Sequence, residues 1–205
     1  MGSDVLNSKI CCCFLGVHID NCLTFDNHID MVTKKIAKNT GILYRIKDCL
    51  PIPARLRFYY AFIYPYLTYN VIVWGSAYKV HLNKLVVQHK RTIRILADAP
   101  YLAHTTALFS NFNLLKFYDI YKFQVAVYMF NSRKNNLYAI DHDVNIRNIN
   151  KCRPKFHRLT SSQHAISFAG PTIWNSLPDY LRSIDSLYSL KKKLKLFFID
   201  KYGNT

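Results

Sequence analysis

Glycine and proline are scarce in this sequence, whose 205 residues include only six Gly and seven Pro. Disordered and low-complexity chains contain more of both, so the composition predicts a chain that folds around a core. Acidic residues are scarce as well: 12 Asp and Glu stand against 28 Lys and Arg, which gives a formal net charge of +16. An excess of this size favours a polyanionic partner, either nucleic acid or an anionic membrane surface.

Motifs for catalysis are also missing. The sequence has no Gly-rich phosphate loop and no Gly-Lys-Ser/Thr motif. The closest pair of carboxylates, Asp141 and Asp143, lies in a polar stretch that we interpret as a surface loop and not as a two-metal site. Ser161 and Ser162 lack the spacing to a histidine that would mark a nucleophile and its base. From these residues alone, the chain is predicted to bind an anionic partner and not to catalyse a reaction.

The N-terminal residues lack the basic and apolar regions of a secretory signal. The six cysteines therefore predict free thiols and not disulfides. Three of them, Cys11, Cys12 and Cys13, are adjacent, and neighbours on a strand point to opposite faces, so they cannot share a metal as a Cys-x-x-Cys pair does. We expect no cofactor in this chain and an intracellular location, in the cytoplasm, the nucleus or both.

The stretch 58–78 contains no charged residue and is long enough to cross a bilayer. It is rich in Tyr, however, and has Pro65 and Asn70 near its middle. Two buried helices that meet near Pro65 account for this pattern better than a membrane span, and no membrane partner is favoured. A module that contacts a protein or a membrane through this Tyr-rich stretch is an alternative.

Hydrophobic periodicity predicts a mainly α fold with a short N-terminal β-hairpin. Residues 10–19 are rich in β-branched and aromatic types, which predicts one or two short strands. Apolar residues then recur at helical spacing to about Leu50, which predicts an amphipathic helix with Asp26 or Asn27 as its cap. A second amphipathic helix is expected over about 80–97.

The C-terminal part of the sequence is more polar and richer in turn residues than the part before it. Shorter helices are expected over 103–131, and a polar, turn-rich segment follows, with alternation only at "HAISFAG". A basic amphipathic helix is expected over about 187–201. The expected divisions are strands in 1–24, a helical bundle in 25–100, further helices in 101–140 and a loop-rich tail with a final helix in 141–205.

Basic residues form two stripes on the predicted amphipathic helices. The first helix carries Lys34, Lys35, Lys38 and Arg45, and the second carries Lys84, Lys90, Arg91 and Arg94. Stripes of this kind suit contacts to phosphates, and a solvated helix face is the alternative interpretation.

Each of three aromatic side chains has a preferred interpretation. His89 falls near the apolar side of its helix, where a core histidine with a satisfied hydrogen bond is preferred to a metal ligand. Trp74 is expected in the core. Trp174 could pack the tail onto the body or stack on a base, and packing is preferred because no other aromatic completes a platform.

Several sequence blocks resemble the reverse transcriptases of non-LTR (LINE, jockey-like) retrotransposons. "FLGVHIDNCLTFDNHI" and "KKIAKNTGILYRIKDCLP" are similar to a block that follows the catalytic palm in that family. "FYYAFIYPYLTYNVIVWG", "LNKLVVQHKRTIRIL" and "GPTIWNSLPDYLR" then follow in the family's order. The resemblance extends from about residue 14 to residue 202, and the order of the blocks is more specific than any one of them.

The resemblance implies roles for the hairpin and the helices. Phe14, Leu15 and Gly16 would belong to the primer grip, a hairpin between palm and thumb that holds the 3′ end of the primer. Gly16 suits this task, because the absent Cβ lets the backbone approach a sugar-phosphate chain. The helices that follow would form the thumb, whose basic faces contact the phosphates of the template-primer duplex.

The chain also departs from the family pattern. Phe25 stands where Trp is frequent and Asn70 where Gly is frequent. The fingers and the palm, with the paired aspartates that bind Mg²⁺, would lie before residue 1. The resemblance therefore implies a C-terminal piece with no catalytic residue and no metal, whose partners are RNA or an RNA–DNA hybrid and the missing palm and fingers. A decayed mobile-element fragment with no retained role is the alternative.

Overall fold

The computed structural model describes residues 11–134, 152, 154, 158 and 164–203. This part of the chain is mainly α-helical, with a two-stranded antiparallel hairpin at its start, which confirms the predicted fold class. Asp141 and Asp143 lie outside the described residues, as do Ser161 and Ser162. The predicted boundary near residue 140 also lies outside them.

The hairpin pairs β1 (Cys11–Phe14) with β2 (Val17–Asp20). Its two turn residues, Leu15 and Gly16, both have positive φ, at 46° and 75°. Two-residue turns of this kind match the right-handed twist of the flanking strands, which explains the tight reversal. On β1, the thiols of Cys11, Cys12 and Cys13 are free.

The Asp20 side chain organises the chain between the hairpin and the first helix. Its carboxylate accepts hydrogen bonds from the backbone N–H groups of Cys22, Thr24 and Phe25, at 3.1, 2.9 and 2.7 Å. Burial raises the pKa of Asp20, but these bonds and the Thr24 hydroxyl together lower it below its ordinary value. The predicted cap at Asp26 or Asn27 is wrong, because α1 (Asp26–Ile46) already contains both residues and has no side-chain cap.

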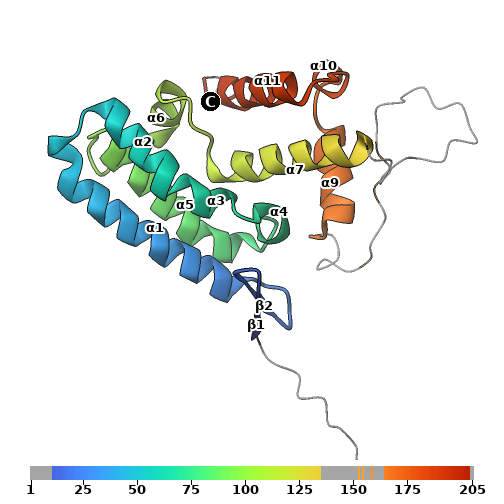
Figure 1. Ribbon diagram of the computed structural model, residues 1–205, viewed down its shortest axis with the longest axis horizontal. Helices are drawn as coiled ribbons and strands as arrows, with labels where there is room; N and C mark the ends of the chain where they lie inside the picture. The colour runs from blue at the N-terminus through green and yellow to red at the C-terminus, as the bar shows by residue number, and fades with distance from the viewer. Residues whose placement is uncertain (1–10, 135–151, 153, 155–157, 159–163, 204–205) are drawn as a thin grey trace, which may run out of the picture.

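Helix α1 packs along α5 (Lys79–Leu96), as Figure 1 shows. The buried apolar side chains of α1 follow the predicted spacing: Ile29, Val32, Ile36 and Leu43. Two polar residues of α1, His28 and Thr40, are also buried, and the Thr40 hydroxyl lies 2.8 Å from that of Thr92 on α5. The interface between these two amphipathic helices therefore combines an apolar stripe with one buried polar contact.

Between these helices, the Tyr-rich stretch forms three short helices. A 3₁₀ turn, η1 (Lys47–Cys49), leads to α2 (Ile52–Phe62), α3 (Tyr64–Thr68) and α4 (Val71–Trp74). The break between α2 and α3 falls at Ile63, with Pro65 in the first turn of α3, so two helices meet there as predicted. The prediction that both are buried is wrong, because α2 and α3 each have one buried residue, Tyr59 and Leu67. Among the described residues, no helix is both long enough and apolar enough to span a bilayer.

Helix α7 (Phe117–Lys134) lies in the middle of the molecule, after α6 (Thr105–Asn111). It contacts α3 and α4 as well as α9 (Ile166–Asn175) and α11 (Leu187–Asp200), which follows the short α10 (Asp179–Arg182). Trp74 stacks on Phe117 at 5.7 Å between ring centroids, and Trp174 is fully buried, so both are core residues, as predicted.

Helix α9 was not predicted from the sequence, which has alternation and a Gly-Pro pair there. Pro171 lies inside this helix, where it removes a backbone donor. A Cβ at Gly170 would lie 2.7 Å from the sulfur of Met129 on α7, so glycine permits the close approach of the two helices. Packing against α7 thus outweighs the weak local propensity of this segment.

Candidate nucleic-acid interface

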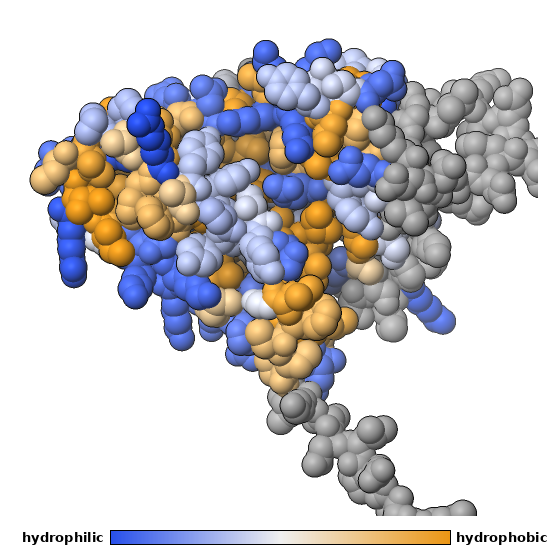
Figure 2. Space-filling view, in the orientation of Figure 1, coloured by the Kyte–Doolittle hydropathy of each residue, from blue (hydrophilic) through white to orange (hydrophobic). Residues whose placement is uncertain are grey.

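The tip of the hairpin is exposed to solvent and is fixed by one hydrogen bond to the helical part of the chain. Phe14 and Leu15 are 65% and 69% exposed. The Tyr69 hydroxyl, from the link between α3 and α4, donates a hydrogen bond of 2.7 Å to the carbonyl of Leu15. On the face seen in Figure 2, hydrophobic side chains gather at this end of the molecule. The three residues predicted for the primer grip therefore form one fixed, solvent-facing turn.

A cavity of about 500 Å³ lies beside this turn, between the hairpin, α1, α2 and α3. Its walls are mostly apolar and aromatic, and its polar lining residues include His28 and Lys35 from α1, and Tyr66 and Tyr69. The sequence analysis did not identify it. The signal that could have pointed to it is the Tyr-rich stretch, which supplies one wall.

His28 of α1 is a buried lining residue of the cavity. It is 2% exposed, and burial, with smaller effects of the charges of His18 and Lys35, lowers its pKa to about 4. Its Nδ1 accepts the backbone N–H of His18 at 3.4 Å, so in the neutral ring the proton is on Nε2. This Nε2 is buried and has no hydrogen-bond partner among the described residues.

The first basic stripe is exposed on the side of α1 away from the core. Lys34, Lys35, Lys38 and Arg45 all face solvent. Hydrophilic side chains project along the α1 edge of the molecule in Figure 2. The Lys35 ammonium lies 5.5 Å from the centre of the Tyr66 ring, and no ion pair joins Lys34, Lys38 or Arg45 to another described residue. These positive charges are available to a ligand.

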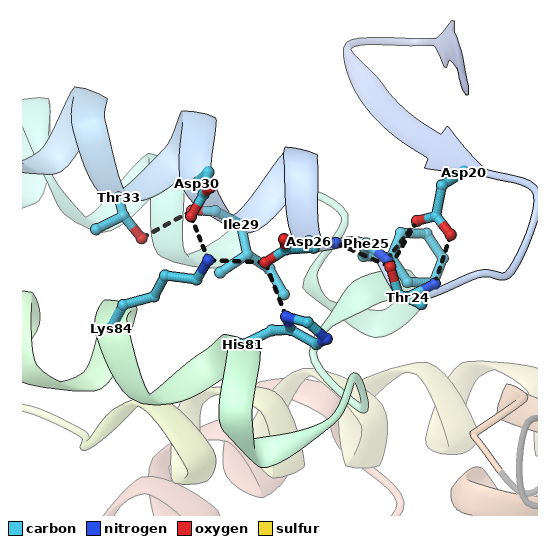
Figure 3. A network of polar contacts seen from close by, with 9 residues as sticks. All are labelled: Asp20, Thr24, Phe25, Asp26, Ile29, Asp30, Thr33, His81 and Lys84. Atoms are coloured by element: carbon cyan, nitrogen blue, oxygen red, sulfur yellow. Dashed lines mark hydrogen bonds and ion pairs between the residues drawn. The ribbon is translucent and has the colours of Figure 1, made fainter. Parts of the chain in front are cut away.

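The four cations of the second stripe, on α5, differ in their contacts. Lys84 forms ion pairs with Asp26, at 2.7 Å, and with Asp30, both on α1 (Figure 3). Asp26 also lies 2.8 Å from Nδ1 of His81, and these contacts, that of Lys84 first, lower the pKa of Asp26 below its usual value. Lys84 therefore joins α5 to the start of α1, and much of its charge is neutralised there.

The other three cations of α5 also differ from one another. Arg94 is half-buried, and its Nε donates to the carbonyl of Ala103 at 2.9 Å. Lys90 and Arg91 are exposed. His89 is buried with Nε2 3.0 Å from the Tyr59 hydroxyl, which confirms its interpretation as a core histidine. Within the part of the chain that the structure describes, no group of three or more His, Cys, Asp or Glu side chains could hold a metal.

Comparisons with known proteins give three curated relatives. The chain is 28% identical over 104 residues to a probable RNA-directed DNA polymerase from transposon BS of Drosophila melanogaster. It is 29% and 30% identical over 96 residues to the RNA-directed DNA polymerases from mobile element jockey of D. melanogaster and D. funebris. The alignments cover 45–49% of this chain but only 10–12% of those proteins. No family model and no solved structure matches.

Proposed function

We propose that this chain, a relative of the RNA-directed DNA polymerases of jockey-like non-LTR retrotransposons, binds template-primer nucleic acid and does not itself supply the polymerase chemistry. One observation carries the proposal: α1 exposes a row of cations, of which Lys34, Lys38 and Arg45 form no ion pair with another described residue, and Lys35 of this row lines the same cavity as the hairpin tip. Lysines in such a row neutralise successive phosphates, which positions a nucleic acid without reading its sequence.

The proposal gives each part a role. The turn at Leu15 and Gly16 meets the end of the primer strand, where the absent Cβ lets backbone approach backbone. Lys34, Lys35 and Lys38 contact the phosphates of RNA or of an RNA–DNA hybrid. Lys90 and Arg91 add contacts from α5, whereas Lys84 joins α5 to α1 and Arg94 binds the loop that follows α5.

The chemistry would come from other parts of a polymerase. In this proposal the palm and fingers are protein partners of the chain, and Mg²⁺ binds in the palm. Catalysis, metal and cofactor are assigned to none of the residues described above. The place of action is where template RNA is found, in the cytoplasm or the nucleus.

The salt dependence of binding tests this function. Fluorescence anisotropy would follow a labelled RNA–DNA primer-template over a salt series, with single-stranded RNA beside it. In the variant Lys34→Glu/Lys35→Glu/Lys38→Glu, the slope of log K against log salt should fall by about 0.7–0.9 for each phosphate that the variant can no longer neutralise. The control Lys191→Glu/Lys192→Glu/Lys193→Glu makes the same change of charge at exposed positions of α11.

The two charge-reversal variants distinguish an interface from general basicity. Retention of the slope in the α11 variant and the predicted reduction of the slope in the α1 variant support the proposal. Equal reductions in both would mean that net charge alone drives binding. Weak binding by the unmodified chain, without preference for the hybrid, would favour the decayed fragment with no retained role.

A further inference from the structure

We propose that the cavity beside the hairpin tip binds one unstacked nucleobase of a single-stranded nucleic acid, with the adjoining phosphate on Lys35. This inference rests on the proposed function and adds a binding site to it. Cavities of roughly 300–1,000 Å³ hold small ligands in proteins. The observed volume of about 500 Å³ is therefore sufficient for a base with its sugar.

The walls suit a flat, weakly polar ring. Tyr66 and Tyr69 line one side, and Phe62 and Pro65 extend the same wall. Aromatic side chains bind bases by stacking, which tolerates any sequence because every base has a π face. Met31 and Val32 add apolar surface from α1. An occupant held in this way would be selected as a base, and its identity would matter little.

The charge at the cavity fits a nucleotide. Lys35 is part of the lining, Lys34 and Lys38 are exposed on the same helix, and none of the described lining residues is acidic. The Lys35 ammonium already lies over the Tyr66 ring, so a base against that ring would bring its phosphate close to a cation. This complementarity favours an anionic strand over an apolar protein segment.

The cavity adjoins the hairpin tip, which suggests what a bound base would do. Leu15 and Gly16 of the exposed turn form part of its rim, so a base in the cavity lies directly against the hairpin tip. Holding one base there would fix where a strand passes the tip without reading the sequence of that strand.

The test uses a short single-stranded oligonucleotide with one 2-aminopurine, whose fluorescence reports on stacking. Ala61 lines the cavity and is exposed, so Ala61→Trp would fill the cavity without entering the core. We expect saturable fluorescence change with the unmodified chain and binding weakened by about tenfold or more in Ala61→Trp, in line with the removal of one stacked base from the complex. The control Val87→Trp adds the same side chain at an exposed site of α5 outside the cavity and should bind normally.

A matched oligonucleotide with an abasic site separates this inference from the proposed function. If the unmodified chain binds both oligonucleotides equally well, the base site is wrong, and salt-dependent binding of the hybrid still stands. If neither the hybrid nor the oligonucleotides bind, the proposed function fails as well. Self-association of the unmodified chain that Ala61→Trp abolishes in sedimentation would show that protein fills the cavity, which also overturns the base site. Circular dichroism of both Trp variants checks that they fold.

Discussion

Besides Leu15, two residues with left-handed backbone shape the surroundings of the hairpin tip. Gly16 has φ of 75°, which L side chains rarely adopt, and Asn70 has φ of 48° between α3 and α4. Asn is one of the few types besides Gly that tolerates this region. The Gly that the resemblance implies at position 70 would suit this backbone, and Asn70 is compatible with the same conformation.

At the residue scale, His89 makes stability depend on pH. Burial lowers its pKa from 6.5 to about 3, so the unfolded chain takes up the proton first as the pH falls. The contribution of neutral His89 to the free energy of unfolding is complete above pH 6.5 and is lost progressively toward pH 3. The loss between pH 7 and pH 4.5 is about 3 kcal/mol. His89→Gln retains a polar partner for Tyr59 but cannot titrate, so its free energy of unfolding should decline less between pH 7 and pH 4.5 in urea titrations.

The control for this prediction is His104→Gln, which changes an exposed histidine. It should follow the unmodified chain at every pH. His28, whose pKa is lowered to about 4, contributes in the same direction and explains why some decline should remain in His89→Gln. An unchanged pH profile in His89→Gln would show that His89 is not kept neutral in the folded protein.

At the scale of elements, the hydroxyl pair between α1 and α5 couples the two helices. Thr40 and Thr92 are buried, and each also lies within hydrogen-bond distance of a carbonyl of its own helix, Ile36 at 2.7 Å and Gln88 at 3.0 Å. Thr40→Val leaves the Thr92 hydroxyl without its cross-helix partner, which should lower the free energy of unfolding by about 1–2 kcal/mol.

The double variant Thr40→Val/Thr92→Val removes both hydroxyls. Because no cross-helix partner is then left unsatisfied, its decrease in stability should be smaller than the sum of the two single decreases, by about 0.5–1 kcal/mol. Urea unfolding of the four proteins measures this coupling. Simple additivity would mean that each hydroxyl is satisfied within its own helix and that the pair contributes nothing.

The helices themselves could be predicted from the sequence, but their polar contacts could not. The repeat of buried apolar residues placed α1 and α5 within a few residues of their observed ends, because a helix needs a continuous apolar face. The same repeat shows that Lys84 is off the apolar face. It does not show that Asp26 and Asp30, more than 50 positions earlier in the chain, lie opposite it. The cavity escaped prediction for the same reason, since four separate segments form it.

At the scale of the whole molecule, the last helices are tied back to the middle of the chain. The Tyr202 hydroxyl donates to Asp119 at 2.6 Å and accepts the backbone N–H of Lys116 at 2.9 Å. Ser76 donates to the carbonyl of His164 at 2.9 Å. The change of texture in the sequence after residue 131 gives no sign of these contacts, because they join residues more than 80 positions apart.

These contacts predict that the two halves of the described structure unfold together. Trp74, in α4, and Trp174, in α9, are both fully buried and report on the two sides of α7. The variants Trp74→Phe and Trp174→Phe each retain one of these two fluorescent reporters. Within each variant, the urea transition followed by tryptophan fluorescence should coincide with the one followed by far-UV circular dichroism, as it does for one cooperative unit.

Comparing two probes within one variant removes the stability difference that each substitution causes. If the Trp174 signal in Trp74→Phe changed at lower urea than the circular dichroism, α9 would unfold before the rest, and the tail would be a separate unit. Coincidence in both variants would mean that α7 joins α3 and α4 to α9 and α11 in one core. The hairpin, the basic face of α1 and the final basic helix would then belong to one cooperative unit. Binding of a nucleic acid at α1 would therefore stabilise α11 as well, through the shared core.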